Sequence, residues 1–370
     1  MLGYRCTNNK RILVLANLDV GLYRFRKELL ETLLAMGHEV YVSLPGGVLI
    51  ENLENMGCRF VETEVDRRGL NPVRDMKLFL EYRKLLKEIK PDLVVTYTIK
   101  PNIYGGLASR LAGVTYAANV TGLGTAFQRK GLAQIVTVLY KAALSKAKTV
   151  FFENEENARE FRKRKILKAE RQTVLPGAGI NLEEYPCTAY PDHDEIRFLY
   201  LGRIMKEKGM DELFAAMNQL RQRYGSRVML DMVGFFEDEY KDQVEQLVKD
   251  GIAVFHGFQQ DPRPYYTRAD CVVLPSYHEG MSNVLLEAAA MGRPIITSDI
   301  PGCREAVENG STGCLCRVKD EEALYEAMCR MAETPRNVRE KMGQAGRRKM
   351  ELEFDKKKVV EQTVAALFSE

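Results

Sequence analysis

Residues 202–209 (GRIMKEKG) place two cations where a diphosphate could bind. The segment follows an apolar stretch typical of a buried strand and precedes a stretch with helical spacing. Arg203 and Lys208 are five positions apart, so a tight turn can direct both side chains to one point above the helix N-terminus. A diphosphate binds well to two cations, a helix dipole and free backbone N–H groups. A lone pair of this kind is more often a solvated loop, so the interpretation depends on a second cluster.

Residues 275–294 (PSYHEGMSNVLLEAAAMGRP) supply that cluster. Glu279 is expected in a loop at the end of a strand, and Glu287 in the first turns of the helix that follows. A carboxylate near a helix start can accept both hydroxyls of a ribose, and the loop carboxylate can meet a more distant part of the same ligand. Taken singly, each would be a surface charge; together they favour a ligand site.

The glycine turn between the two carboxylates is expected to bind an anion. Gly280, Met281 and Ser282 are predicted to form a turn whose N–H groups point the same way. Ser282 or Asn283 is predicted to cap the following helix. His278 is a candidate base, with loop packing or substrate contact as equal alternatives.

The elements that position these residues alternate between strand and helix. Apolar runs predict strands at 11–16, 40–44, 59–64, 92–96, 115–119 and 149–152, and again at 197–201, 228–233, 252–255, 271–274 and 294–297. Residues 176–195 hold three prolines and two glycines without periodicity and are interpreted as a linker. From residue 320 onward the pattern is helical.

This alternation predicts two doubly wound, Rossmann-like α/β domains facing a central cleft. The expected N-terminal domain comprises residues 1–180 and a returning helix at 353–370, and the expected C-terminal domain comprises 181–352. Loops at the carboxyl ends of both sheets should face the cleft.

The two clusters resemble the retaining family-4 glycosyltransferases of the GT-B fold, through EGMSNVLLEAAAMGRPIITSD and GRIMKEKG. LYRFRKELLETLLAMGHEV, YTIKPNIYGGLASRLAG and NVTGLGTAF resemble the branch that builds bacterial surface polysaccharides and lipid-linked oligosaccharides. The resemblance implies that Arg203 and Lys208 bind the nucleotide diphosphate and that Glu287 binds the ribose. It implies that Glu279 and the N–H groups of 280–282 contact the donor sugar.

The resemblance carries a full set of site residues. The implied catalytic residues are Arg203, Lys208 and Glu279. The implied nucleotide-sugar site consists of Gly21, Gly202, Arg203, Lys208, Phe258, Glu279, Gly280, Met281, Ser282, Asn283 and Glu287. The implied acceptor site, within residues 17–24, 100–104 and 119–125, consists of Asn17, Asp19, Tyr23, Arg24, Lys100, Asn102, Tyr104, Asn119 and Thr121.

Two departures from the family pattern concern the N-terminal half. Relatives often have a glycine pair in the first βα loop, where this chain has only Gly21. Some members place a histidine after the fifth strand, where this chain has none. Asn119 or Thr121 could replace that histidine.

The expected reaction is transfer of a sugar, preferably an N-acetylhexosamine, from a UDP-sugar to an undecaprenyl-diphosphate-linked or glycan acceptor, with retention. The UDP-sugar is a co-substrate, and no cofactor or metal is expected. Asp192-His193-Asp194 is formally a metal motif but lies in the linker. Two alternatives stay open: a non-hydrolysing nucleotide-sugar epimerase of the same fold, and a catalytically silent partner subunit.

The net charge of +3 hides an asymmetry. Residues 1–180 carry 29 Lys and Arg against 18 Asp and Glu, and residues 181–370 carry 25 against 33.

No stretch approaches the ~18 apolar residues of a membrane span, and no signal peptide is recognised. Residues 129–148 hold five cations and no acid among apolar residues. This pattern predicts a cytoplasmic protein that binds anionic lipid on the inner face of the cell membrane. The alternative is that the helix expected within residues 129–148 packs on the first sheet, with its lysines reaching solvent. Nothing indicates a nucleic-acid partner.

Overall fold

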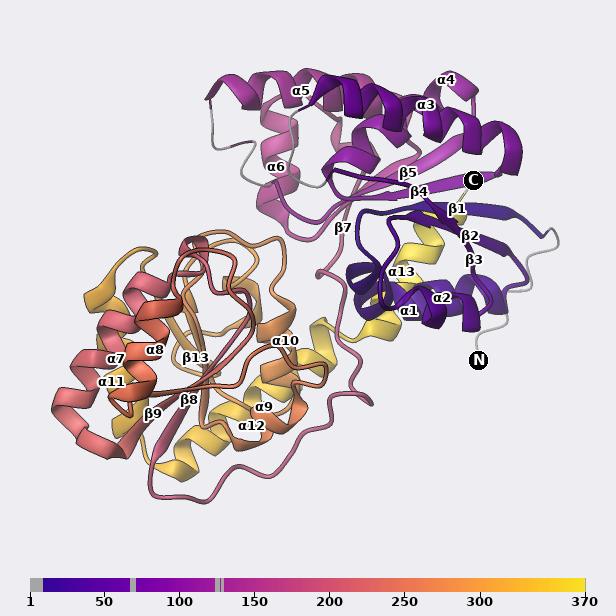
Figure 1. The fold of residues 1–370 in the computed structure, drawn as a ribbon. Coiled ribbons are helices and arrows are strands. Elements are labelled where there is room, and N and C mark those ends of the chain that lie inside the picture. The colour runs from indigo at the N-terminus through magenta and orange to yellow at the C-terminus, as the bar shows by residue number, and fades with distance from the viewer. Residues whose placement is uncertain (1–8, 67–70, 124–126, 128–129, 370) are drawn as a thin grey trace. The chain divides into compact units, whose positions relative to one another are not determined.

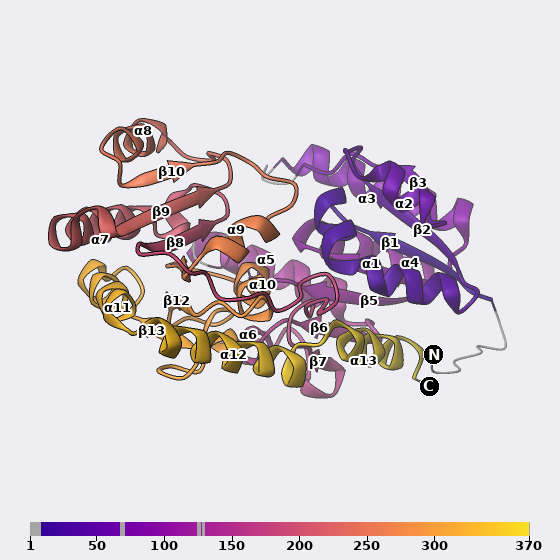
Figure 2. The same ribbon diagram turned by 90° about the horizontal axis from the view of Figure 1, so that it is seen from below.

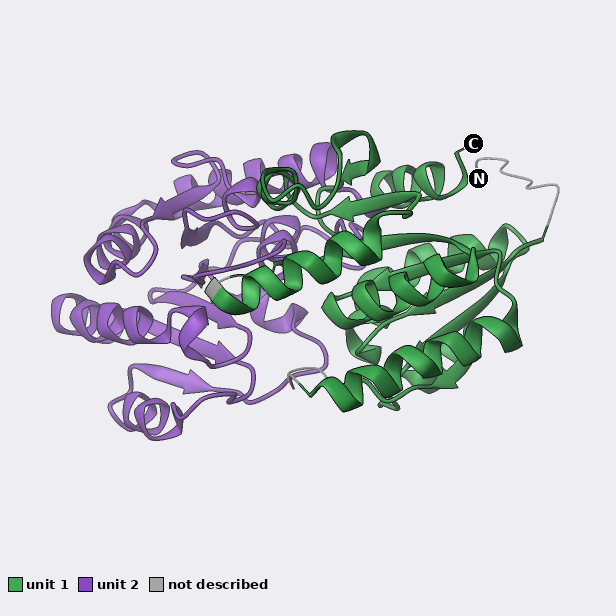
Figure 3. Ribbon diagram, turned by 90° about the horizontal axis from the view of Figure 1, so that it is seen from above, with its two compact units in different colours: residues 1–178, 357–370 green, residues 179–356 purple. Residues whose placement is uncertain are grey.

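A computed structural model describes residues 9–66, 71–123, 127 and 130–369. Two of the expected features lie outside the described residues: the end of the loop at 124–125 and the cation Arg129. The chain forms two compact units, residues 1–178 with 357–370 (unit 1) and residues 179–356 (unit 2) (Figure 3).

Unit 1 is built on a parallel sheet with the strand order β3-β2-β1-β4-β5-β6-β7. The chain begins in the centre, runs to one edge, and then returns to fill the other side, which is the doubly wound order. Its strands are β1 (Arg11–Leu15), β2 (Glu39–Leu44), β3 (Arg59–Glu62), β4 (Leu93–Tyr97), β5 (Thr115–Val120), β6 (Thr149–Phe152) and β7 (Gln172–Val174).

Helices cover both faces of this sheet (Figure 1). They are α1 (Asp19–Ala35), α2 (Ile50–Asn55), α3 (Pro72–Ile89), the π-helix η1 (Pro101–Gly105), α4 (Gly106–Ala112), α5 (Lys130–Leu144), α6 (Glu155–Lys163), the 3₁₀ turn η3 (Ala169–Arg171) and α13 (Lys356–Phe368). Alternate strand residues point to opposite faces. Leu13 therefore joins the core under α3, α4, α5 and α6, and its neighbours Ile12 and Val14 join the core under α1 and α13.

Unit 2 repeats the same plan with the order β10-β9-β8-β11-β12-β13, again all parallel. Its strands are β8 (Ile196–Leu201), β9 (Val228–Val233), β10 (Ala253–Phe255), β11 (Cys271–Leu274), β12 (Ile295–Ser298) and β13 (Gly313–Cys316). Its helices are α7 (Met210–Tyr224), α8 (Lys241–Lys249), α9 (Arg263–Arg268), α10 (Asn283–Ala290), α11 (Glu321–Glu333) and α12 (Arg336–Glu353), with the 3₁₀ turns η4 (Lys206–Lys208), η5 (Gly225–Arg227) and η6 (Arg304–Ala306). Helix α11 packs on α7, and α12 packs along α10 (Figure 2).

The segment interpreted as a linker is fixed to unit 2 over much of its length. The guanidinium of Arg293 is almost fully buried and donates to the carbonyls of Ala189 at 2.8 Å and Tyr266 at 2.8 Å. Tyr190, in the same segment, is buried, and its hydroxyl donates to the carbonyl of Asp270. A composition rich in proline and glycine therefore marks irregular chain here, while a buried cation satisfied by carbonyls holds it in place.

Among the helices of the described residues, none combines the length and the apolar content needed to cross a bilayer.

Candidate active site

The loop between β8 and α7 is shaped by close approaches of backbone. Gly234 has φ +155, and a Cβ there would lie 1.8 Å from the carbonyl oxygen of Gly202, so the loops after β8 and β9 touch through glycine. Gly209 has φ +73, and a Cβ there would lie 2.2 Å from the carbonyl oxygen of Pro275. Only glycine fits both conditions at these two positions. The β8 loop is thereby pressed against the loops that follow β9 and β11.

Arg203 is held at the carboxyl end of β8 by two contacts. The hydroxyl of the buried Tyr200 donates to the carbonyl of Arg203 at 2.5 Å. The Arg203 guanidinium forms an ion pair with Glu237 at 2.6 Å, with its side chain 43% exposed. Arg203 was predicted from its position after an apolar run, but Tyr200 and Glu237 were not predicted as its partners. This geometry gives a fixed backbone with a charged group that is still accessible to a ligand.

Lys208 and Glu279 form an ion pair that joins the two predicted clusters. Lys208 ends η4, Glu279 lies in the loop between β11 and α10, and both side chains are largely shielded from solvent. The resemblance implied that Lys208 binds the diphosphate and that Glu279 contacts the sugar. The structure brings them together directly, so each neutralises the other.

The turn at 280–282 differs from the predicted anion nest. The N–H of Ser282 donates to the carbonyl of Gly302 at 2.8 Å, and so this N–H is not available to a ligand. Gly302 can approach because it has no side chain: a Cβ there would lie 2.4 Å from the carbonyl oxygen of Gly280. Ser282 is the N-cap residue of α10, as predicted, but its side chain makes no capping hydrogen bond. The helix begins at Asn283, and its positive end lies beside Met281.

Glu287 is nearly buried in α10, with 9% of its surface exposed. Its Oε2 accepts a hydrogen bond from the hydroxyl of Tyr266 at 2.8 Å. Burial, together with the charge of Glu287, raises the pKa of Tyr266, so this phenol stays a donor. Glu287 is therefore an oriented carboxylate rather than a free surface charge. Tyr266, which donates to this carboxylate, was not among the predicted residues.

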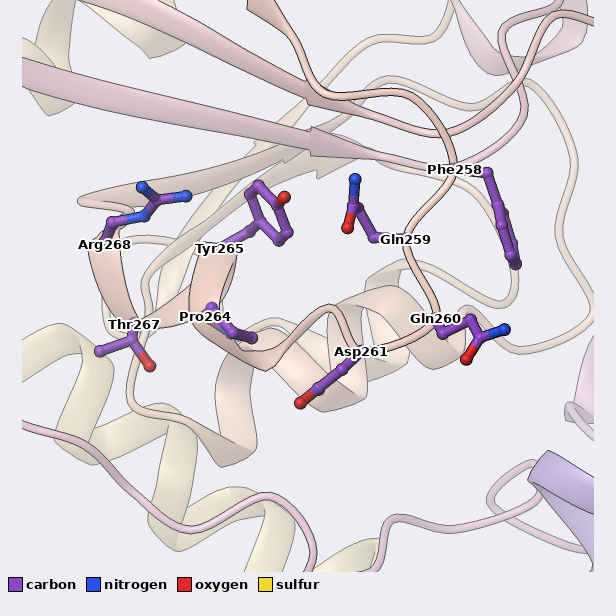
Figure 4. Close-up of a pocket in the computed structure, with 8 residues that line it drawn as sticks. All are labelled: Phe258, Gln259, Gln260, Asp261, Pro264, Tyr265, Thr267 and Arg268. Carbon is purple, nitrogen blue, oxygen red and sulfur yellow. The ribbon is translucent and has the colours of Figure 1, made fainter.

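Phe258 follows β10 and is 57% exposed. Its ring lies edge-to-face against exposed Phe235 at a centroid distance of 6.2 Å. Phe258 also borders a cavity of about 800 Å³, shown in Figure 4 with Tyr265 and Arg268 on the opposite side. The cavity is lined by Phe258, Gln259, Gln260, Asp261, Pro264, Tyr265, Thr267 and Arg268. Exposed aromatic faces of this kind can stack on a planar base.

Two histidines of unit 2 lie near these loops. The Nε2 of His256 is 2.6 Å from Oδ1 of Asp231, whose other oxygen is paired with Arg197 at 2.8 Å. His256 is thus part of a structural network. Burial, and then the charge of Lys319, lowers the pKa of His278, which favours its neutral form.

Most predicted acceptor residues of unit 1 are engaged internally. Asn102 is fully buried, accepts from the hydroxyl of Thr96 at 2.6 Å and donates to the carbonyl of Asn119 at 2.8 Å. The side chain of Asn119 donates in turn to the carbonyl of Thr96 at 3.2 Å. Asp19 is buried and accepts from the N–H of Leu49 at 2.8 Å. These polar groups hold the carboxyl edge of the sheet together.

Lys100 and Tyr104 converge on one carboxylate of α3. Asp75 is 2.7 Å from Lys100 Nζ and accepts from the Tyr104 hydroxyl at 2.9 Å. Burial, and then this hydrogen bond, raises the pKa of Tyr104. The remaining predicted residues on this edge are partly or fully exposed: Asn17, Gly21, Tyr23, Arg24 and Thr121. Among the described residues, no group of three or more His, Cys, Asp or Glu side chains is arranged to hold a metal ion.

Two family models match the chain, one in each unit. The family described as "Glycosyl transferase 4-like" matches residues 11–154, and the family described as "Glycosyl transferases group 1" matches residues 195–334.

Curated relatives match over most of the chain. A Campylobacter jejuni N,N'-diacetylbacillosaminyl-diphospho-undecaprenol alpha-1,3-N-acetylgalactosaminyltransferase is 28% identical, over 87% of this chain and 89% of that protein. An Escherichia coli UDP-Gal:alpha-D-GlcNAc-diphosphoundecaprenol alpha-1,3-galactosyltransferase is 28% identical, over 72% of this chain and 73% of that protein.

Solved structures share the fold. The Anabaena protein Alr3699/HepE, in complex with UDP and glucose, superposes with a TM-score of 0.80 at 18% identity, over 98% of this chain and 100% of that chain. With both units matched by family models and with two doubly wound parallel sheets, the chain belongs to the glycosyltransferases of the GT-B fold.

Proposed function

We propose that this chain transfers a sugar, preferably an N-acetylhexosamine, from a UDP-sugar to an acceptor linked to a polyprenyl diphosphate, with retention of the anomeric configuration. The observation that carries the proposal is the ion pair between Lys208 and Glu279 at the carboxyl edge of the sheet of unit 2, beside Arg203 and the start of α10. Both of the relatives described above are named for transfer to a diphospho-undecaprenol acceptor, and the Anabaena structure contains UDP.

The ion pairs suggest how the donor enters. A diphosphate brings two or more negative charges to a place where Lys208 is already neutralised by Glu279. Lys208 can exchange its partner for a phosphate oxygen, and this exchange frees Glu279 to accept from a sugar hydroxyl. Arg203, which is more exposed, binds the diphosphate from the other side. Glu287, which Tyr266 holds in place, accepts the ribose hydroxyls.

The same cations act in the reaction itself. As the bond to the sugar breaks, charge accumulates on the leaving diphosphate, and Arg203 and Lys208 stabilise it. The acceptor hydroxyl attacks from the face that the diphosphate leaves, and a phosphate oxygen takes its proton. No protein base is required in this scheme, which agrees with the engagement of His256 by Asp231.

The proposed location is the cytoplasmic face of the cell membrane, where a polyprenyl-linked acceptor is found. The cationic surplus of residues 1–180 supports contact with anionic lipid through unit 1.

A donor and acceptor screen tests the proposal. UDP- and GDP-sugars are incubated with short polyprenyl-diphosphate sugars, and the products are analysed by mass and by the anomeric coupling constant. We expect one UDP-sugar to add a single α-linked residue. Conversion of a UDP-sugar without acceptor would indicate an epimerase instead, and absence of UDP binding would indicate a silent subunit.

A further inference from the structure

Three polar side chains meet at the carboxyl edge of the sheet of unit 1. Asp75 lies in the first turn of α3, Lys100 directly precedes η1, and Tyr104 lies within η1. The Nζ of Lys100 is 2.7 Å from Oδ1 of Asp75, and the Tyr104 hydroxyl donates to Oδ2 at 2.9 Å. We call these three side chains the Asp75 cluster. Lys100 and Tyr104 were predicted to bind the acceptor, whereas Asp75 was not predicted.

The Asp75 cluster carries no net charge. The ammonium of Lys100 and the carboxylate of Asp75 balance each other, and their side chains are 13% and 14% exposed. Burial, and then the hydrogen bond to Asp75, raises the pKa of Tyr104, so the phenol stays neutral. A ligand that binds to these three groups therefore needs no charge of its own.

The charges around the start of α3 are balanced as well. Arg74 is 3.4 Å from a carboxylate oxygen of Asp66, and Lys77 is 3.7 Å from one of Glu64. Two N–H groups in the first turn of the helix donate to the side chain of Asn71, at 3.0 and 3.3 Å. A phosphate group at this place would have to displace a carboxylate from each cation and the side-chain cap from the helix. The surroundings therefore favour a neutral ligand over an anion.

The Asp75 cluster retains donors and acceptors that suit hydroxyl groups. Within the described residues, Lys100 uses one of its three ammonium protons, in the pair with Asp75. Each oxygen of Asp75 accepts one hydrogen bond from the cluster and has a second lone pair. A sugar hydroxyl can donate to the carboxylate and accept from the ammonium, and hydrogen bonds to ionised groups are the stronger kind.

The backbone that positions Lys100 and Tyr104 is energetically costly. Thr98, at the end of β4, has φ +72, which is an outlier for a β-branched residue. Its buried Oγ1 has no hydrogen-bond partner among the described residues. The π-helix η1 follows, and π turns are rare and occur frequently at functional sites. Strained conformations cluster at sites of function, which supports a ligand-binding role for the side chains that this segment presents.

We infer that the Asp75 cluster binds the sugar of the acceptor rather than its diphosphate, and that Asp75 is a specificity-determining residue for that sugar. The inference rests on the proposed function for the presence of an acceptor, and it adds the chemical class that this edge recognises. That class is a neutral sugar with neighbouring hydroxyls, one of which donates to Asp75 while another accepts from Lys100.

Kinetics with two forms of one acceptor test the inference. The acceptor sugar identified by the screen described above is supplied on a short polyprenyl diphosphate and as a neutral octyl glycoside. Asp75→Asn should raise the KM for both forms by the same factor, roughly tenfold, because a charged acceptor of a sugar hydrogen bond is lost. The KM for the donor should not change. An octyl glycoside that is not turned over is measured as a competitive inhibitor instead.

The control and a second variant keep the test independent of folding. Lys84→Met removes a lysine of the same helix, which pairs with Glu88 at 3.8 Å, and should leave both KM values unchanged. Tyr104→Phe keeps the ring and removes only the hydroxyl that orients Asp75, so it should raise both KM values by a smaller, equal factor.

Two results would overturn the inference. If the diphosphate were the ligand, Asp75→Asn would release Lys100 and lower the KM for the diphosphate form alone. If the cluster were only structural, both KM values would stay at those of the wild type while the thermal midpoint fell.

Binding without turnover separates this inference from the proposed function. If the wild type transfers no sugar to any acceptor, the proposed function fails. Octyl glucoside, octyl galactoside and octyl N-acetylglucosaminide are then titrated into the wild type and Asp75→Asn by saturation-transfer NMR. Weaker binding of one glycoside to the variant would uphold the sugar site, and equal or absent binding of all three would reject it.

Discussion

The two sheets have the same order of strands around the centre, yet their carboxyl edges use polar side chains differently. In unit 2, charged side chains pair between loops: Arg203 with Glu237, and Lys208 with Glu279. In unit 1, polar side chains satisfy the backbone of the edge itself, as Asn102 does for Asn119. The edge of unit 2 therefore holds charges that a ligand can take over, whereas the buried polar side chains of the unit 1 edge mainly stabilise that edge, apart from ion pairs such as Lys100 with Asp75.

The largest effect is expected at the cation of unit 2. Arg203→Ala should lower kcat by about 10²–10³-fold, because the leaving diphosphate loses a charge partner. The thermal midpoint should stay near that of the wild type, since the side chain is partly exposed. Steady-state kinetics and calorimetry measure the two quantities. Turnover like that of the wild type would show that Arg203 does not stabilise the leaving diphosphate.

A substitution at the carboxyl edge of the unit 1 sheet should have the opposite effect: it should lower stability and leave donor binding unchanged. Asn102→Ala removes the buried hydrogen bonds from the hydroxyl of Thr96 and to the carbonyl of Asn119, which should cost about 2 to 3 kcal/mol in the free energy of unfolding. UDP affinity should not change. Denaturant titration and UDP calorimetry check both. Asn17→Ala is the control, because Asn17 is half-buried on the same edge, and its effect should stay within about 0.5 kcal/mol.

A smaller effect is expected for the oriented carboxylate of α10. Glu287→Gln keeps the shape of the side chain but removes its charge, so the KM for the donor should rise roughly tenfold with kcat nearly constant. Tyr266→Phe should raise the same KM by less, because it only releases the carboxylate. A fall in kcat with constant KM would place Glu287 at the reacting sugar instead.

The smallest effect is expected in the pH dependence of stability. One histidine in each unit should contribute to it. Burial lowers the pKa of both His38 in unit 1 and His278 in unit 2 below 6.5. Below pH 6.5 the unfolded chain therefore binds more protons than the folded chain at these sites, and stability falls as the pH decreases. His38→Gln and His278→Gln should each flatten the drop in the denaturation midpoint between about pH 7.5 and 5.5. An unchanged slope in both variants would exclude them as its source.

Apolar runs and glycines were enough to predict the central architecture. The strands β9 and β11 lie where their runs of Val, Leu and Cys placed them. The edge strands β7 and β13 were missed because Gln172–Val174 and Gly313–Cys316 are too short and too mixed to show a strand pattern. These two strands form because they pair with β6 and β12, and such pairing cannot be read from the local sequence of β7 or β13.

The site was predicted by residue type but not by partner. Arg203, Lys208, Glu279 and Glu287 could be selected because cations and carboxylates follow apolar runs at suggestive spacings. That Lys208 would meet Glu279 depends on Gly209 lying against Pro275, which no local pattern reveals. The predicted N–H nest was wrong at Ser282 for the same kind of reason, since its acceptor, Gly302, is supplied by a distant loop.

The helix α13 has a consequence for how the protein is made. Val359, Val364 and Leu367 complete the core of unit 1 together with residues of α1 and β1. A ribosome must therefore synthesise the whole of unit 2 before that core can close. During this interval the part of that core that α13 covers stays exposed to water, and exposed apolar surface of this kind makes an incomplete domain prone to aggregation. The folding of unit 2 has no comparable delay, so unit 2 can fold while the core of unit 1 is still incomplete.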